Sequence, residues 1–356
     1  MPHSSDRFAA MRIFDASTNR ALEAVRVVED VARFALDDPL LTEQWKLLRH
    51  ELAKVAALLP AAERLAARDT IHDVGTRIST ESEQARADID ALLRANFERL
   101  KQSLRGMEES AKLLAGFGLL PPDAAPTLES LRYRGYTLEK ATLLSVDAGR
   151  RLSSARLCWL TPATEPPEAI EAVLRAGVDV VQLRDKMATD RQLIERAKML
   201  RSISRQTDVL FIVNDRADIA ALCDADGVHV GQEELSVSDV RRIVGGERLV
   251  GVSTHDIKQA RQAVLEGASY IGVGPTFPGA TKQFDDFPGL PLIRQVATEI
   301  RLPWFAIGGI DEQNVADVMA AGAERVAVSG ALQGDAAVAA AQQMKTRLDG
   351  QPAANR

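Results

Sequence analysis

From residue 157 almost to the C-terminus, short β-rich runs alternate with longer segments of helical periodicity. We expect strands at 157–161, 178–184, 209–213, 227–230, 249–253, 269–273, 303–307 and 325–329. Several helical segments end in glycine just before the next run, as at Gly177, Gly267 and Gly322, where glycine supplies a left-handed helix cap. Eight strand–helix units in about 200 residues predict an α/β protein with a (β/α)8 TIM barrel. An open doubly wound sheet is the alternative, but it does not require eight units, and no Gly-x-Gly-x-x-Gly follows the first run.

The first third of the chain has only helical periodicity. Apolar residues recur at helical spacing from about Arg12 to Gly118, and a proline-rich run at 119–126 then interrupts the pattern. We therefore expect an all-α amino-terminal domain over 1–125, a linker over 126–155 and the barrel over 156–350.

The helical region also repeats itself. Residues 20–34 (RALEAVRVVEDVARF) align with 99–113 (RLKQSLRGMEESAKL) at a constant offset of 79. The identical positions pair Arg20, Arg26, Glu29 and Ala32 with Arg99, Arg105, Glu108 and Ala111. This match predicts an internal duplication with approximate twofold symmetry. In the first copy one helical face carries Asn19, Glu23, Arg26, Asp30 and Arg33, either as a solvated face with ion pairs or as the lining of a polar pocket or interface.

Composition excludes several classes of protein. The chain is 46% hydrophobic and 26% charged with a net charge of -6, which is typical of a globular protein and unlike a general nucleic-acid binder. The only cysteines, Cys158 and Cys223, indicate a reducing compartment. We found neither an apolar signal core at the start nor a run of about 18 apolar residues. These features predict a soluble, cytoplasmic protein without nucleic-acid or membrane partners.

The end of the second expected strand carries two cations. Gln182, Arg184 and Lys186 alternate, so they point to the same side of an extended strand, which in a barrel is the interior. Cations there are costly unless anions compensate them, and a bound polyphosphate would do so. A salt-bridged strand end is the alternative interpretation.

Two carboxylates follow the next two strands. Asp215 and Glu234 come after neighbouring strands, close to the expected cationic site. Oxygen donors beside a phosphate site suit Mg2+, which often bridges protein carboxylates and substrate phosphate. Taken singly, either residue could instead cap a helix or favour its first turn.

The remaining strand ends offer further groups for binding anions. Ser253 follows the fifth strand, as a substrate ligand or a helix cap, and Lys282 lies near the end of a Gly/Pro-bearing loop at 274–282. Gly309 and the Ser329–Gly330 pair follow the last two strands, where backbone N–H groups form the usual phosphate site of this fold. One cationic site and one backbone site suit an enzyme that joins two phosphorylated small molecules and releases pyrophosphate.

The motifs at these strand ends resemble those of the thiamine-phosphate synthase family. The matching segments are VQLRDK (181–186), IVNDRADIA (212–220), ADGVHVGQEEL (225–235), GVSTH (251–255), GPTFPGATK (274–282), FAIGGI (305–310) and AAGAERVAVSGAL (320–332). The resemblance implies that hydroxymethylpyrimidine diphosphate condenses with hydroxyethylthiazole phosphate to give thiamine phosphate and pyrophosphate. It also implies Mg2+ as cofactor and a dissociative step through a pyrimidine-stabilised carbocation.

The resemblance further assigns roles to individual residues. The pyrimidine diphosphate would be bound by Gln182, Arg184, Lys186, Asn214, Ser253 and Lys282, of which Arg184, Lys186, Ser253 and Lys282 would be catalytic. Asp215 and Glu234 would hold Mg2+. The thiazole phosphate would be bound by Gly279, Thr281, Gly309, Ser329 and Gly330. The family often has Asp at the position of Glu234, and Thr or Ser at that of Gly279, so metal geometry and one phosphate contact are expected to differ here.

Other functions stay open at this point. A thiazole tautomerase-like or regulatory barrel would not need the diphosphate site, and the retained cations and carboxylates argue against it. The helical region resembles an extension fused to some bacterial members of the family, for which a hydroxymethylpyrimidine-phosphate kinase role has been proposed. It could equally be structural or dimerising, and the chain could form a homo-oligomer.

Overall fold

The computed structural model describes residues 4–71, 73–74, 85–278 and 287–350, which form two compact units, Met1–Leu143 and Leu144–Arg356. In the second unit the strands pair in parallel and in chain order from β1 to β8, and β8 closes on β1. The strands are β1 (Leu157–Thr161), β2 (Val180–Leu183), β3 (Leu210–Asn214), β4 (Gly227–Val230), β5 (Leu249–Thr254), β6 (Tyr270–Val273), β7 (Trp304–Ile307) and β8 (Val326–Val328). The (β/α)8 barrel expected from the sequence is confirmed.

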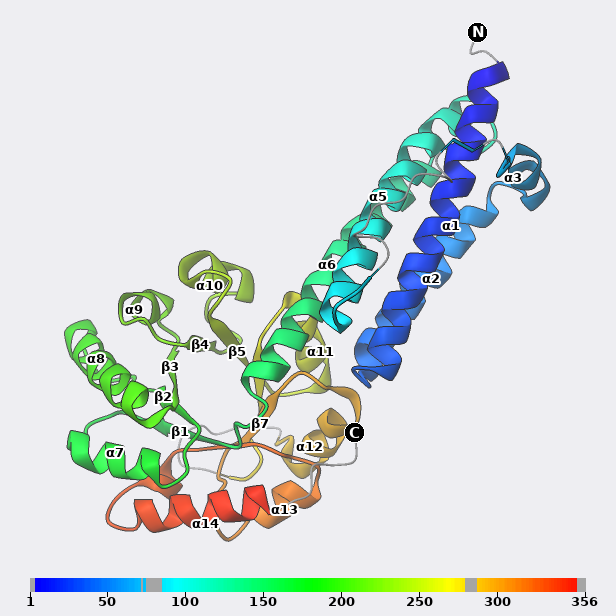
Figure 1. Cartoon of the computed structure of the whole chain (residues 1–356). Helices are drawn as coiled ribbons and strands as arrows, with labels where there is room; N and C mark the ends of the chain where they lie inside the picture. The colour runs from blue at the N-terminus through cyan, green and yellow to red at the C-terminus, as the bar shows by residue number, and fades with distance from the viewer. Residues whose placement is uncertain (1–3, 72, 75–84, 279–286, 351–356) are drawn as a thin grey trace. The chain divides into compact units, whose positions relative to one another are not determined.

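Helices surround this barrel on the outside (Figure 1). They are α7 (Pro167–Arg175), α8 (Asp190–Thr207), α9 (Ala217–Leu222), α10 (Val237–Val244), α11 (Ile257–Glu266), α12 (Gly289–Glu299), α13 (Val315–Ala320), the 3-10 helix η1 (Gly330–Leu332) and α14 (Ala337–Asp349). None of the helices within the described ranges is long and apolar enough to cross a membrane.

Aliphatic and aromatic side chains fill the barrel interior. The buried cluster includes Cys158, Leu160, Val180, Ile212, Leu249, Tyr270, Phe305 and Ala327. Glycine at 251 leaves room for the ring of Tyr270, because a Cβ there would lie 2.1 Å from the ring's Cζ atom. The same ring packs edge-on against Phe305, with centroids 5.7 Å apart. The interior is therefore a packed core that supports the strand ends.

The first unit is a bundle of long helices (Figure 1). Its helices are α1 (Ser4–Phe34), α2 (Pro39–Ala57), the short α3 (Ala61–Ala67), α5 (Ile89–Gly116) and α6 (Ala124–Arg151). Helices α1 and α5 lie side by side and run antiparallel, and they approach closely where a Cβ on Gly106 would meet the Ser17 hydroxyl at 2.6 Å. The indole of Trp45 on α2 stacks on Phe97 of α5 and donates to Thr142 Oγ1 of α6.

The linker expected over 126–155 is not what the structure shows. Most of that segment is helix α6, and Leu128, Leu131 and Leu138 on it are buried. Pro126 lies in the first turn of α6, where a missing N–H costs no helical hydrogen bond. The compact helical unit accordingly extends to Leu143 instead of ending at residue 125.

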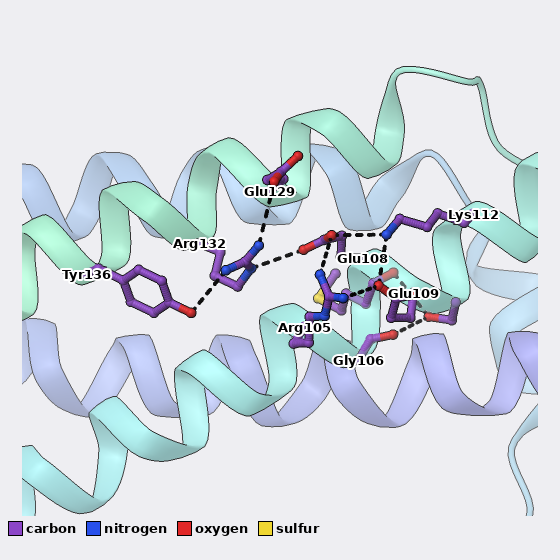
Figure 2. A network of polar contacts seen from close by, with 10 residues as sticks. Arg105, Gly106, Glu108, Glu109, Lys112, Glu129, Arg132 and Tyr136 are labelled. Carbon is purple, nitrogen blue, oxygen red and sulfur yellow. Dashed lines mark hydrogen bonds and ion pairs between the residues drawn. The ribbon is translucent and has the colours of Figure 1, made fainter.

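Equivalent buried ion pairs support the predicted duplication of the helical unit. Glu29 of α1 pairs with Arg49 of α2 at 2.5 Å, and Glu108 of α5 pairs with Arg132 of α6 at 3.0 Å. Both glutamates are 3% exposed. Figure 2 shows the second pair within a larger network, in which Glu108 also accepts from Lys112. Burial opposes the ionisation of Glu108, but the hydrogen bonds from its cationic partners outweigh burial and lower its pKa.

The polar face of the first repeat carries ion pairs at helical spacing. Arg26 lies 3.2 Å from Asp30 and 3.5 Å from Glu29. The second repeat reproduces this arrangement, with Arg105 2.7 Å from both Glu108 and Glu109. Of the two interpretations of this face, the structure supports the solvated face with ion pairs.

Candidate active site

Charged and polar groups converge at the carboxyl ends of the barrel strands. Lys186, beyond β2, places its Nζ atom 4.0 Å from Asp215 Oδ2, beyond β3. The charge of Glu234, beyond β4, contributes to raising the pKa of Asp215, so the two carboxylates interact. The sequence prediction that the cations and the carboxylate pair share one site is therefore consistent with the structure.

Gln182 is the deepest polar group of the β2 segment. It is 4% exposed, and its Oε1 atom has no hydrogen-bond partner among the described residues. Arg184 lies just past the strand, where its backbone N–H donates to Thr161 O at 2.9 Å. The side chain of Lys186 is 51% exposed, so it does not enter the barrel interior as the alternation suggested. Only Gln182 of these three is buried inside the barrel.

Asp185 shapes the loop that carries Lys186, and the sequence analysis assigned it no role. Its Oδ1 atom accepts from Met187 N at 2.8 Å, and its other oxygen pairs with Arg196 of α8. Burial works against the charged form, but these hydrogen bonds and the guanidinium lower the pKa of Asp185. The sequence Arg-Asp-Lys alone does not predict this role of Asp185. The role becomes visible only when the position of Arg196 on the following helix, α8, is known.

Asp215 has a conformation and an environment suited to a metal ligand. Its φ is +61°, a left-handed value that an aspartate tolerates, and its N–H donates to His229 O at 2.7 Å. Burial and the charge of Glu234 raise its pKa. Gly231 allows Glu234 to occupy its position, since a Cβ at 231 would lie 2.3 Å from Glu234 Oε2.

The donor set fits a divalent cation that is shared with a substrate. No group of three or more His, Cys, Asp or Glu side chains gathers within the described ranges. Mg2+ is commonly held by one or two carboxylates, with substrate phosphate and water completing its shell. A repelling carboxylate pair beside a lysine matches that mode of binding better than an all-protein cage.

A buried polar cluster lies inside the barrel, and the sequence analysis missed two of its members. His229 contacts Ser253 Oγ through Nε2 at 2.9 Å and the Tyr270 hydroxyl through Nδ1 at 3.2 Å. Burial, with a smaller effect from the charge of Arg184, lowers the pKa of His229 to about 4. Ser253 is thus oriented by a neutral imidazole, and its helix-cap alternative is not realised, because Asp256 caps α11.

The backbone that follows β7 is closely packed and requires glycine, and a short helix follows β8. Gly309 has a φ of +62°, and a Cβ there would lie 2.8 Å from Pro278 O. Ser329 and Gly330 are exposed, and η1 begins at Gly330. Gly279, Thr281 and Lys282, which the sequence analysis assigned to substrate binding, lie outside the described residues, so their roles stay predictions.

The closed (β/α)8 barrel carries cations and carboxylates at the carboxyl ends of its strands. This arrangement is typical of TIM-barrel enzymes that bind phosphorylated substrates. A sequence model described as thiamine monophosphate synthase matches residues 156–332, and one described as the ThiD2 family matches residues 12–141. The thiamine-phosphate synthase of Rhodopirellula baltica is 45% identical over 335 residues, covering 90% of this chain and 88% of the relative. That of Synechocystis sp. is 41% identical over 324 residues and covers 90% of each chain.

A solved structure supports the same assignment for the barrel. The thiamine phosphate pyrophosphorylase from Pyrococcus furiosus is 29% identical, with a TM-score of 0.51, and the match covers 55% of this chain and 95% of that one. The chain belongs to the thiamine-phosphate synthase family and is a transferase of thiamine biosynthesis.

Proposed function

We propose that the barrel joins hydroxymethylpyrimidine diphosphate to hydroxyethylthiazole phosphate with the help of Mg2+, by a dissociative mechanism. The observation that carries this proposal is the single cluster of Lys186, Asp215 and Glu234 at the strand ends, with the unpartnered Gln182 oxygen below it. This cluster supplies charge neutralisation for a diphosphate.

The reaction begins with departure of the leaving group. The bond between the pyrimidine methylene carbon and the diphosphate oxygen breaks, and the oxygen keeps the electron pair. Arg184 and Lys186 stabilise the charge that develops on the diphosphate, and the sequence predicts the same role for Lys282. Preorganised cations at the position of developing charge are the main source of catalysis in such a step.

Capture of the carbocation forms the product. The thiazole nitrogen donates its lone pair to the methylene carbon, and the new C–N bond gives thiamine phosphate without any proton transfer. No general base is needed, so positioning of the two substrates is the remaining contribution. His229 orients Ser253 and stays neutral at pH 7, so its imidazole adds no positive charge that would oppose the carbocation.

Asp215 and Glu234 would hold Mg2+, which neutralises charge on the diphosphate when it is bound. Burial and, to a smaller extent, the charge of Glu234 raise the pKa of Asp215, and a bound cation would favour the charged form of both carboxylates. Backbone groups at Gly309, Ser329 and Gly330 would bind the phosphate of the thiazole, in keeping with the usual phosphate site of the fold.

The test measures thiamine phosphate and pyrophosphate formed by the full chain from both substrates and Mg2+. Lys186→Ala and Asp215→Ala should abolish turnover while leaving the circular dichroism spectrum unchanged. Lys198→Ala, which removes an exposed lysine from the outer helix α8, is the matched control and should keep full activity. Near-normal turnover in both site variants would overturn the proposal.

The proposed reaction uses residues of the barrel only. A kinase activity on the pyrimidine monophosphate stays a prediction for that unit. Supplying the monophosphate and ATP in place of the diphosphate tests it, and failure to form thiamine phosphate from that mixture would argue against the kinase.

A further inference from the structure

A cleft opens on the helical unit, and all of its described lining residues belong to Met1–Leu143. It has a volume of about 800 Å3 and is lined by α1, α5 and the segment just before α5. The polar side chains of its lining include Ser17, Arg20, Arg86, Arg99, Gln102 and Ser103. Pockets of this size typically hold small molecules.

Two of its arginines lack the partners that most arginines of this unit have. Arg20 and Arg99 are exposed and have no ion pair or hydrogen bond among the described residues. Arg26, Arg49 and Arg132 of the same bundle are each paired with a carboxylate. Within the described part of the helical unit, no carboxylate pairs with these two arginines.

Two serines also line the cleft. Ser17 is 7% exposed and Ser103 is 6% exposed, and neither hydroxyl has a hydrogen-bond partner among the described residues. Both residues line the same cleft as the arginines, so a ligand there could satisfy them.

The repeat places the two arginines at equivalent positions. The offset of 79 aligns Arg20 with Arg99, the helices α1 and α5 that carry them run antiparallel (Figure 1), and both residues line the same cleft. Among the described residues that line the cleft, Glu98 is the one acidic residue. Its carboxylate contacts Lys101 at 2.7 Å, and no ion pair joins it to Arg20 or Arg99.

We propose that this cleft binds the phosphate group of a small phosphate ester. Arg20 and Arg99 supply the charge, since guanidinium groups match phosphate oxygens in geometry and charge. The serine hydroxyls donate to the same oxygens. The organic part of the ester lies against Ala91 and Ala95, which give the cleft a small apolar wall.

Chemical modification tests the site in the wild-type full chain. Phenylglyoxal modifies accessible guanidinium groups, and mass spectrometry of peptides gives the rate at each arginine. Phenyl phosphate at about four times its Kd, which fills about 80% of the sites, should slow modification of Arg20 and Arg99 about fivefold. Arg33, exposed on the same helix with only a ring contact to Phe34, is the internal control and should be unaffected.

Inorganic phosphate separates an ester site from a plain anion site. Phenyl phosphate should protect both arginines at lower concentration than inorganic phosphate does, because its ring contacts the apolar wall. Equal protection by the two probes would overturn the assignment of an ester. Unchanged rates at both arginines with either probe would overturn the site itself.

A variant provides a second measurement. In calorimetric titration with phenyl phosphate, the number of sites should fall by one in Arg20→Gln/Arg99→Gln and stay constant in Arg33→Gln. An unchanged number in the double variant would also refute the proposal. Both replaced side chains are exposed, so the fold should persist, and synthase turnover by the barrel serves as an independent check that the variant is intact.

Discussion

Lowering the pH from 7 to 5 should destabilise the barrel by about 2 kcal/mol through His229 alone. The pKa of this imidazole is lowered to about 4, chiefly by burial, whereas in the unfolded chain it is about 6.5. As the pH falls below 6.5, the unfolded chain takes up a proton that the folded barrel does not, and stability is lost down to about pH 4. Linkage with these two pKa values gives about 2 kcal/mol at pH 5 and about 3 kcal/mol at pH 4.

Urea unfolding at pH 7 and pH 5 measures this effect. In a Trp45→Phe background the remaining tryptophans, Trp159 and Trp304, both lie in barrel strands, so fluorescence reports that unit. His229→Gln should lower stability at pH 7 but reduce the loss between pH 7 and pH 5 by about 2 kcal/mol. His50→Gln, at an exposed site, should leave the pH dependence unchanged. An equal loss in His229→Gln and in the parent would refute the reasoning.

Three further substitutions test other parts of the structure. Gly231→Ala would place a Cβ 2.3 Å from Glu234 Oε2 and displace that carboxylate. The Mg2+ concentration that gives half-maximal turnover should therefore rise. An unchanged Mg2+ dependence would contradict the assignment of Glu234 as a metal ligand. Gly251→Ala would place a Cβ 2.1 Å from the Tyr270 ring, and such overpacking typically costs about 1–3 kcal/mol in urea unfolding. Glu108→Ala removes the nearest carboxylate from buried Arg132 and leaves it only that of Glu129, at 3.8 Å. Loss of helical ellipticity should show a destabilisation of about 3 kcal/mol, the lower end for breaking a buried pair; a loss below about 1 kcal/mol would indicate that Glu129 or water replaces the pair.

The barrel was predictable because its signals are local. Strand runs, helical periodicity and cap glycines each lie within a few residues, and β1 and β4 have the bounds expected from the sequence. The buried position of Gln182 also follows from strand alternation. Lys186 departs from that rule because β2 ends at Leu183, after which the backbone no longer alternates.

The buried cluster around His229 was not predictable in the same way. Its contacts to Ser253 and Tyr270 span 24 and 41 residues, and they depend on the register of three neighbouring strands. The incorrect prediction of a linker over 126–155 has a local cause instead. Pro126 was interpreted as a helix breaker, although proline is compatible with the first turn of a helix. Local patterns therefore predict elements well, and contacts between distant elements poorly.

The duplicated helices place arginines in two different environments. Arg49 and Arg132 each face a buried glutamate on a neighbouring helix, and each pair fixes the packing of its own half. Arg20 and Arg99 instead border the shared cleft of α1 and α5, where no carboxylate pairs with them among the described residues. Packing among the described residues gives no reason to keep two arginines without a carboxylate partner at one cleft. A bound phosphate provides that reason, and it would make the cleft a second anion site of the chain, independent of the barrel.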